Sequence, residues 1–225
     1  MTNVGKKAWL ALAIVTTVMG LSLFVPAGTV VYWQAWVLLS LFVVGSVLIT
    51  LYVIKHDPAL LERRLSGGPA AEKRSVQRLI MLIASACFIA VLVVPGIDRR
   101  FGWSDVPIGV VIAGDVLFAV GFAIVFLVYR QNSFASATIE VAENQKVIST
   151  GPYAIVRHPM YAGSIVYLVG MPLGLASYWG LIPVAAMAPF LIWRLLDEER
   201  FLAKNLAGYT EYQKKVRHRL VPFVW

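Results

Sequence analysis

The feature that most constrains this sequence is its succession of long apolar segments. Six of them are long or apolar enough to span a membrane, namely residues 8–25, 30–54, 79–94, 108–129, 161–175 and 179–196. The third and the fifth are marginal against the ~18 residues that a spanning helix needs. Inside hydrocarbon, every backbone N–H and C=O group must be paired within the protein, which leaves helices or a closed barrel. Because the apolar residues are continuous and do not alternate with polar ones, the sequence predicts an all-α fold, a polytopic membrane helical bundle of about six transmembrane helices.

The charged residues support this interpretation by their placement. Only 14% of the residues are charged, against 59% that are hydrophobic, which does not suit a soluble fold. The twenty Lys and Arg residues lie mostly before the first apolar segment and after the second, fourth and sixth. By the positive-inside rule, both termini are expected in the cytoplasm. The same distribution fits anionic lipid headgroups better than a nucleic acid, so we expect membrane lipids and no nucleic acid among the partners.

The polar motifs divide the chain into two regions. Residues 1–130 contain four predicted spans, whereas residues 131–225 contain the motifs, a transmembrane hairpin and a cytoplasmic C-terminal segment. Residues 55–77 predict a mobile surface loop in which Ser66-Gly67-Gly68-Pro69 forms a flexible tip between two polar helical pieces. Apolar side chains at steps of three and four across residues 197–219 predict an amphipathic helix at the cytoplasmic membrane surface.

Polar residues beside the last two spans are the first candidates for chemistry, because their burial is costly unless they are paired or functional. Arg157-His158-Pro159-Met160-Tyr161 directly precedes the fifth span. Its proline suits the first turn of a helix, whose N-terminal N–H groups are able to receive an anionic ligand group. The same five residues would also serve as an ordinary interfacial anchor.

Two further groups are candidates. Arg194 and Glu198, four residues apart at the end of the sixth span, share a helix face and could form an ion pair, while Glu199 points some 100 degrees away. This group either closes the helix at the surface or holds an anionic substrate. The run from Gln145 to Tyr153 predicts either a plain turn or an extended backbone that lies against a flat ligand.

Two isolated residues have simpler interpretations. Asp115 lies inside the fourth span, where we expect a hydrogen bond to a neighbouring helix in preference to a proton relay. Cys87 is the single cysteine, so the sequence allows neither an intrachain disulfide nor a metal site built from cysteines.

Taken together, the motifs of the final third resemble a known family. The sequence contains in order Gly151-Pro152-Tyr153, Arg157-His158-Pro159-x-Tyr161-x-Gly163, Arg194-x-x-x-Glu198-Glu199, Tyr209-x-x-Tyr212 and a last stretch that ends at Pro222. This order and spacing, over residues 145–222, resembles the isoprenylcysteine carboxyl methyltransferase family and its relatives among the phospholipid methyltransferases.

The resemblance implies an integral membrane methyltransferase that uses S-adenosyl-L-methionine (SAM) and releases S-adenosyl-L-homocysteine (SAH). It further implies a lipophilic acceptor that enters from the bilayer. Carried over by motif, the SAM-binding residues are Gln145, Lys146, Val147, Ile148, Tyr153, His158, Pro159, Met160, Tyr161 and Glu198. Arg194 takes the place of a catalytic residue that orients the acceptor. Methyl transfer from a sulfonium needs near-attack geometry and the exclusion of water, so no metal is expected.

Other acceptors and other functions stay open at this stage. A prenylcysteine carboxylate is the acceptor that the resemblance favours, and a phospholipid amine or a small thiol would suit the same donor site. A membrane reductase that uses NADPH is an alternative enzyme class. A transporter or scaffold is the non-enzymatic alternative, although transport predicts more polar residues deep in the spans than this sequence has.

Overall fold

The computed structural model describes residues 3–72 and 74–225, and regular structure in this part of the chain is entirely helical. The α-helices are α1 (Asn3–Ala27), α2 (Trp33–His56), α3 (Pro58–Leu65), α4 (Ser75–Phe101), α5 (Ile108–Gln131), α6 (Pro159–Gly174), α7 (Leu181–Asn205) and α8 (Tyr209–Lys215). Two short 3-10 helices, η1 (Pro69–Ala71) and η2 (Gly151–Ala154), lie in the connections. The predicted all-α class is confirmed, and each of the six apolar segments corresponds to one helix, with at most three residues of a segment outside it.

Four of the six predicted spans are long and apolar enough to cross a membrane, namely α1, α2, α4 and α5. The other two differ for separate reasons. α6 has only 16 residues, and α7, with 25, carries Arg194, Asp197 and Glu198 in its second half. The chain is therefore an integral membrane protein with four clear candidate spans, followed by two apolar helices that are shorter or more polar.

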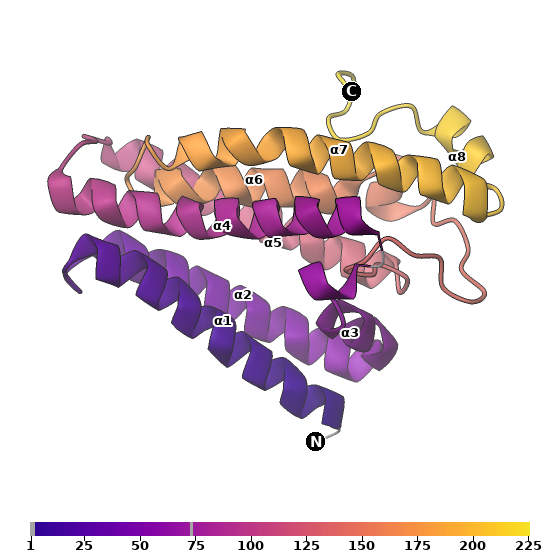
Figure 1. Ribbon diagram of the computed structural model, residues 1–225, viewed down its shortest axis with the longest axis horizontal. Helices are drawn as coiled ribbons and strands as arrows, with labels where there is room; N and C mark the ends of the chain where they lie inside the picture. Colours follow the sequence, from indigo (N-terminus) through magenta and orange to yellow (C-terminus); the bar gives the residue numbers. More distant parts are fainter. Residues whose placement is uncertain (1–2, 73) are drawn as a thin grey trace.

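The helices form two groups (Figure 1). α4, α5, α6 and α7 run side by side, and the hairpin of α1 and α2 crosses them obliquely. The short connections α1–α2, α4–α5 and α6–α7 gather at one end of the molecule. α3, the long connection before α6, and α8 gather at the opposite end. The connections that are richest in Lys and Arg therefore share one end.

Glycines bring α5 and α6 into backbone contact. A methyl group added to Gly170 of α6 would lie 2.6 Å from the carbonyl oxygen of Gly114, and one added to Gly121 of α5 would lie 2.6 Å from the carbonyl oxygen of Gly163. Small residues at helix contacts allow this close approach in membranes. α6 is thereby held against α5, which fixes the position of the polar residues at its N-terminal end.

The C-terminal amphipathic helix was predicted as one piece, and the structure corrects this. α7 continues to Asn205, the chain then bends, and α8 begins only at Tyr209 after Gly208, whose φ of +82° lies in the left-handed region that favours glycine. The predicted apolar face is nevertheless found, because Leu206, Tyr209 and Tyr212 form a buried cluster. The bend turns this face back onto the protein.

The two helical pieces predicted within residues 55–77 are confirmed, whereas the expected surface position is wrong for part of the segment. Its described residues include α3, η1 and the start of α4, and Asp57 caps α3 by accepting a hydrogen bond from the Leu60 N–H at 2.9 Å; Lys73 lies outside the described residues. Glu72 and Gln77 are 3% and 0% exposed. Their polar side chains therefore face inward.

The hydrogen bond predicted between Asp115 and a neighbouring helix is not formed in the part of the chain that the structure describes. Its Oδ1 atom is buried and has no hydrogen-bond partner among the described residues. The side chain lies instead against Gly174, where an added methyl group would be 2.6 Å from Asp115 Oδ1. Asp115 thus lies at the close contact between α5 and α6.

Candidate active site

A cavity of about 530 Å³ opens at the end of the bundle where the basic connections gather. Its size is usual for a small-molecule site. It is lined by α3, α4, α6, α7, α8 and the connection between α5 and α6. All eleven residues predicted for the site line it: Gln145, Lys146, Val147, Ile148, Tyr153, His158, Pro159, Met160, Tyr161, Arg194 and Glu198. Residues distributed over 54 positions of the chain, from 145 to 198, therefore share one cavity.

Glu199 anchors one wall of this cavity. Its Oε1 accepts a hydrogen bond from Arg157 Nε at 2.6 Å and lies 3.2 Å from His158 Nε2, while its Oε2 accepts from Arg219 Nε at 2.9 Å. Arg157, His158 and Glu199 are all less than 9% exposed. The arginine that the sequence left open as a surface anchor is a buried structural residue.

The C-terminal segment is joined to the start of α6 by the same network. Arg157 Nη1 donates to the carbonyl oxygens of Val216 and Arg217, each at 2.9 Å. The backbone N–H groups of Arg157 and His158 donate to the carbonyl oxygens of His218 and Arg219 at 2.9 and 3.0 Å. His158 directly precedes α6, and Pro159 is its first residue, as the sequence predicted.

The pKa of the Glu199 carboxyl reflects this environment. Burial alone would raise the pKa, but hydrogen bonds from His158, Arg157 and Arg219 outweigh it and lower the pKa from 4.5 to about 2. Glu199 is therefore ionised at every physiological pH, and its charge compensates the buried arginine beside it.

Arg194 is paired, although not with the residue that its spacing suggested. Its Nη2 lies 2.6 Å from Glu72 Oε1, in a contact that is an ion pair without the alignment of a hydrogen bond. Nη1 donates to Gln77 Oε1 at 2.9 Å, and Nη2 donates to the carbonyl oxygen of Ala137 at 3.1 Å. Glu198 instead accepts a hydrogen bond from the Tyr161 hydroxyl at 2.8 Å.

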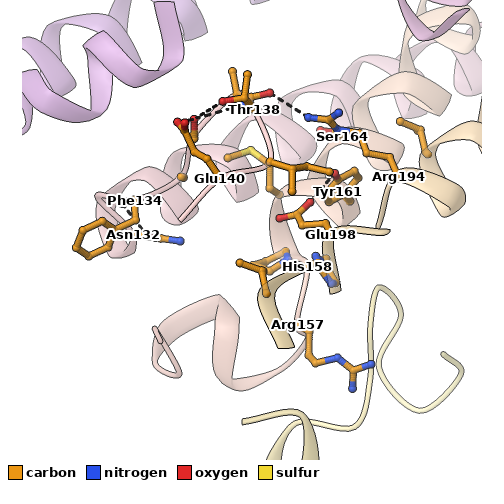
Figure 2. A pocket seen from close by; sticks show the side chains of 18 of the residues that line it. Asn132, Phe134, Thr138, Glu140, Arg157, His158, Tyr161, Ser164, Arg194 and Glu198 are labelled. Carbon is orange, nitrogen blue, oxygen red and sulfur yellow. Dashed lines mark hydrogen bonds between the residues drawn. The ribbon is translucent and has the colours of Figure 1, made fainter. Parts of the chain in front are cut away.

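Figure 2 shows how these side chains lie. Arg194, Tyr161 and Glu198 converge from α7 and α6, whereas Arg157 points away toward the C-terminal segment. Arg194 is 7% exposed. A guanidinium has five N–H donors, and three contacts to protein leave it able to donate to a ligand. The arrangement offers an orienting cation whose charge is already partly balanced by Glu72.

The connection from Gln145 to Tyr153 forms another part of the cavity wall and packs against α8. Residues 145–149 have no helical structure, and Gly151, with φ of +60°, begins η2. The Gln145 side chain accepts a hydrogen bond from the Ala142 N–H at 2.8 Å, so it is used within the loop. Tyr153 accepts from Asn132 Nδ2 at 2.8 Å, and burial raises the pKa of its hydroxyl to about 12, so the hydroxyl stays neutral.

One buried polar atom on the cavity wall lacks a partner. The hydroxyl of Tyr209, a residue that is 4% exposed, makes no hydrogen bond with any described residue. Buried hydroxyl groups nearly always find a partner in native proteins. A ligand with an acceptor atom at this wall would supply one.

A second cavity of about 340 Å³ adjoins the first. It lies among α1, α2, α3, α4, α5 and α6, and most of its lining is apolar. The two cavities share the five lining residues Arg64, Phe88, Met160, Ser164 and Tyr167. The N-terminal helices, which carry no motif, therefore line a mostly apolar space that meets the larger cavity with its charged side chains.

Sequence reasoning missed several residues of the site. Glu72 and Gln77 had no distinguishing signal, because they lie in a segment that the sequence predicts to be a surface loop. Helical spacing put Glu199 on a different helix face from Arg194 and Glu198 and gave it no partner. In the structure its carboxylate pairs with the buried Arg157 and His158. Arg64 was one of several basic residues in a connection, and nothing in the sequence distinguished it from Arg63.

Comparisons with known proteins agree with the resemblance. The family model described as Phospholipid methyltransferase matches residues 110–208. Protein-S-isoprenylcysteine O-methyltransferase B of Arabidopsis thaliana is 30% identical over 155 residues, which are 65% of this chain and 73% of that protein. A probable protein-S-isoprenylcysteine O-methyltransferase of Oryza sativa subsp. indica is 30% identical over 93 residues, 38% of this chain and 46% of that protein. A Delta(14)-sterol reductase of Mus musculus is 30% identical over 91 residues, 39% of this chain and 22% of that protein.

Proposed function

This chain belongs to the membrane methyltransferase family of phospholipid methyltransferases and isoprenylcysteine O-methyltransferases, and on that premise we propose that it transfers a methyl group from SAM to a prenylcysteine-like carboxylate. The observation that carries the proposal is the pair of adjoining cavities. The larger is lined by all eleven predicted site residues, with charged side chains among apolar ones, and the smaller lies among the membrane helices with Arg64 as the single charged residue among its described lining. A polar donor and a lipophilic acceptor would meet where the cavities join.

The residues of the larger cavity fit SAM. The unpartnered Tyr209 hydroxyl requires an acceptor, which the adenosine and carboxylate groups of SAM supply. The rings of Tyr153, Tyr161 and Tyr212 also line the cavity, and aromatic faces attract a sulfonium cation. Glu198 adds a carboxylate for hydroxyl or amino groups. When bound, SAM supplies an electrophilic methyl group that a carboxylate oxygen is able to attack directly.

The protein's own part in this reaction is positioning. An ionised carboxylate needs no general base, so Arg194 is proposed to orient the acceptor. Its ion pair with Glu72 weakens its hold on the acceptor, which keeps the attacking oxygen nucleophilic. The start of α6 and the C-terminal segment are joined through Glu199, and this junction is proposed to keep the cavity in shape and to limit access of water.

The membrane topology forms part of the proposal. We propose that α6 and α7 complete a bundle of six spans with both termini and the larger cavity at the cytoplasmic side. This arrangement is supported by the gathering of the basic connections at the end that holds this cavity. The division into an N-terminal region, 1–130, and a methyltransferase region, 131–225, stays a prediction, since both regions line the two cavities.

The purified chain in lipid nanodiscs is expected to transfer radiolabelled methyl groups from SAM to N-acetyl-S-farnesylcysteine. It is expected to transfer few methyl groups to phosphatidylethanolamine or to an alkyl thiol, because among these three acceptors only N-acetyl-S-farnesylcysteine has a carboxylate on a lipophilic tail. The product ester is detected by its release of methanol in base. If the label appeared in the phospholipid or in a thioether instead, the proposed methyl transfer would stand and the proposed prenylcysteine acceptor would be wrong.

The same preparation tests the reductase alternative, which the sterol reductase relative raises. A dinucleotide phosphate needs several unpaired cations, whereas Arg157 and Arg194 are committed to Glu199 and Glu72. Among the described Lys and Arg residues that line the larger cavity, this leaves only Arg64 and Lys146 without a carboxylate partner. We therefore expect no saturable binding of NADPH. Binding of NADPH with no binding of SAH would contradict the proposed function.

A further inference from the structure

Arg64 occupies a distinctive position in this protein. It is the single charged side chain among the described residues that line the smaller, mostly apolar cavity, and it also lines the larger one. It belongs to α3, outside the region that carries the family motifs. A cation beside an apolar space is costly unless an opposite charge compensates it.

The partners of Arg64 set it apart from the other arginines near the site. Arg157 and Arg219 are paired with Glu199, and Arg194 is paired with Glu72. Among the described residues no carboxylate lies within ion-pair distance of Arg64. Its guanidinium donates to the carbonyl oxygen of Ser136 at 3.0 Å and lies 5.4 Å from the Tyr129 ring centre. These contacts hold the group in place and leave its charge unpaired.

Lys146 is the other cation of the larger cavity for which no carboxylate partner is found among the described residues. It is exposed, and it does not line the apolar cavity. An amphiphile whose tail fills the apolar cavity would have its polar end at the residues common to both cavities. Arg64 is the charged residue among the five described residues that line both cavities, and Ser164 and Tyr167 are the two that carry hydroxyl groups.

We propose that Arg64 binds the anionic group of the acceptor where the two cavities meet, and thereby selects acidic amphiphiles over neutral ones. This inference rests on the proposed function and deepens it by assigning the acceptor's charge to a residue outside the family motifs. Arg194 then orients the reacting atom beside the donor. The anion is a carboxylate or a phosphate, since a guanidinium forms bidentate hydrogen bonds with either.

The test compares Arg64→Gln with Arg63→Gln. Arg63 is the adjacent residue of α3 and likewise donates to a backbone carbonyl, that of Ser133, and lies over the ring of Phe134, but it lines neither cavity. The full chain in nanodiscs is titrated with tritiated N-acetyl-S-farnesylcysteine, with its neutral carboxamide and with lysophosphatidylethanolamine. SAH binding is measured on the same samples.

Wild type and Arg63→Gln are expected to bind one of the two probes that contain an anionic group, the farnesylcysteine carboxylate or the zwitterionic lysophospholipid with its phosphate, roughly 10- to 100-fold more tightly than the carboxamide, the range for a hydrogen-bonded charge. In Arg64→Gln this preference is expected to vanish, with unchanged affinity for SAH and for the carboxamide. Arg64→Lys should restore part of it. The probe that shows the preference identifies the anion as carboxylate or phosphate.

Three results would overturn the inference. Equal preference in Arg64→Gln and Arg63→Gln removes Arg64 from acceptor selection, and absence of any preference in wild type removes the selection itself. Loss of SAH binding in Arg64→Gln alone assigns Arg64 to the donor. Failure of the proposed function looks different, because there wild type itself binds no SAH.

Discussion

Arg194→Gln is expected to lose methyl transfer by roughly 100- to 1000-fold, the usual effect of removing a donor that acts at the reacting group. The affinity for SAH is expected to change less than about threefold, since other residues form most of the donor wall. Activity is measured with saturating N-acetyl-S-farnesylcysteine and SAH affinity by calorimetry. Arg200→Gln, an exposed change on the same helix, serves as the control and should keep both values.

The structural role of Arg194 is separated from its catalytic role by a second variant. Arg194→Gln leaves Glu72 buried without its ion-pair partner, which destabilises the fold. Combining it with Glu72→Gln removes that unpaired charge. The double variant should regain much of the thermal midpoint and none of the activity. Recovery of activity together with stability would show that Arg194 only supports the fold.

Glu199→Gln is expected to lower stability more than any other single change in the site. The carboxylate accepts hydrogen bonds from Arg157 and Arg219 and contacts His158, and its loss leaves a buried guanidinium without its counter-charge. Breaking such a buried pair costs roughly 3 to 5 kcal/mol. The thermal midpoint in nanodiscs measures this, with the exposed Glu211→Gln as the matched control.

The same carboxylate predicts a pH dependence. The pKa of Glu199 is about 2 in the folded protein and 4.5 in its ordinary state. Its contribution to stability is therefore complete above about pH 4.5 and is lost as the pH falls toward 2. The difference in midpoint between wild type and Glu199→Gln should shrink across this window. A difference that is constant from pH 6 to pH 3 would contradict the assigned role.

The sequence was sufficient for those parts of the fold and site that depend on local pattern. Continuous apolar segments predicted every long helix, and Pro159 marked the start of α6. The order of motifs from Gln145 to Glu198 identified eleven residues that share one cavity. These inferences succeed because lipid permits few backbone arrangements and because each motif is contiguous in sequence.

Long-range contacts could not be predicted in the same way. The ion pair of Arg194 with Glu72 joins residues 122 positions apart, and helical spacing favoured Glu198 instead. Arg63 and Arg64 are identical in type, and only the packing of α3 places one of them at the two cavities. The bend at Gly208 also follows from tertiary packing, since the apolar steps of three and four continue across it.

The central claim is that the cavity of about 530 Å³ binds SAM through the residues of its motifs. Its most direct test is equilibrium binding of SAH to the detergent-purified chain, with His158→Ala, Glu198→Ala and the control Glu211→Gln. Saturable binding by wild type and the control, lost or weakened at least about tenfold in both site variants with folding intact, is the predicted result. Folded wild-type protein that binds no SAH, or site variants that bind it as wild type does, would contradict the account.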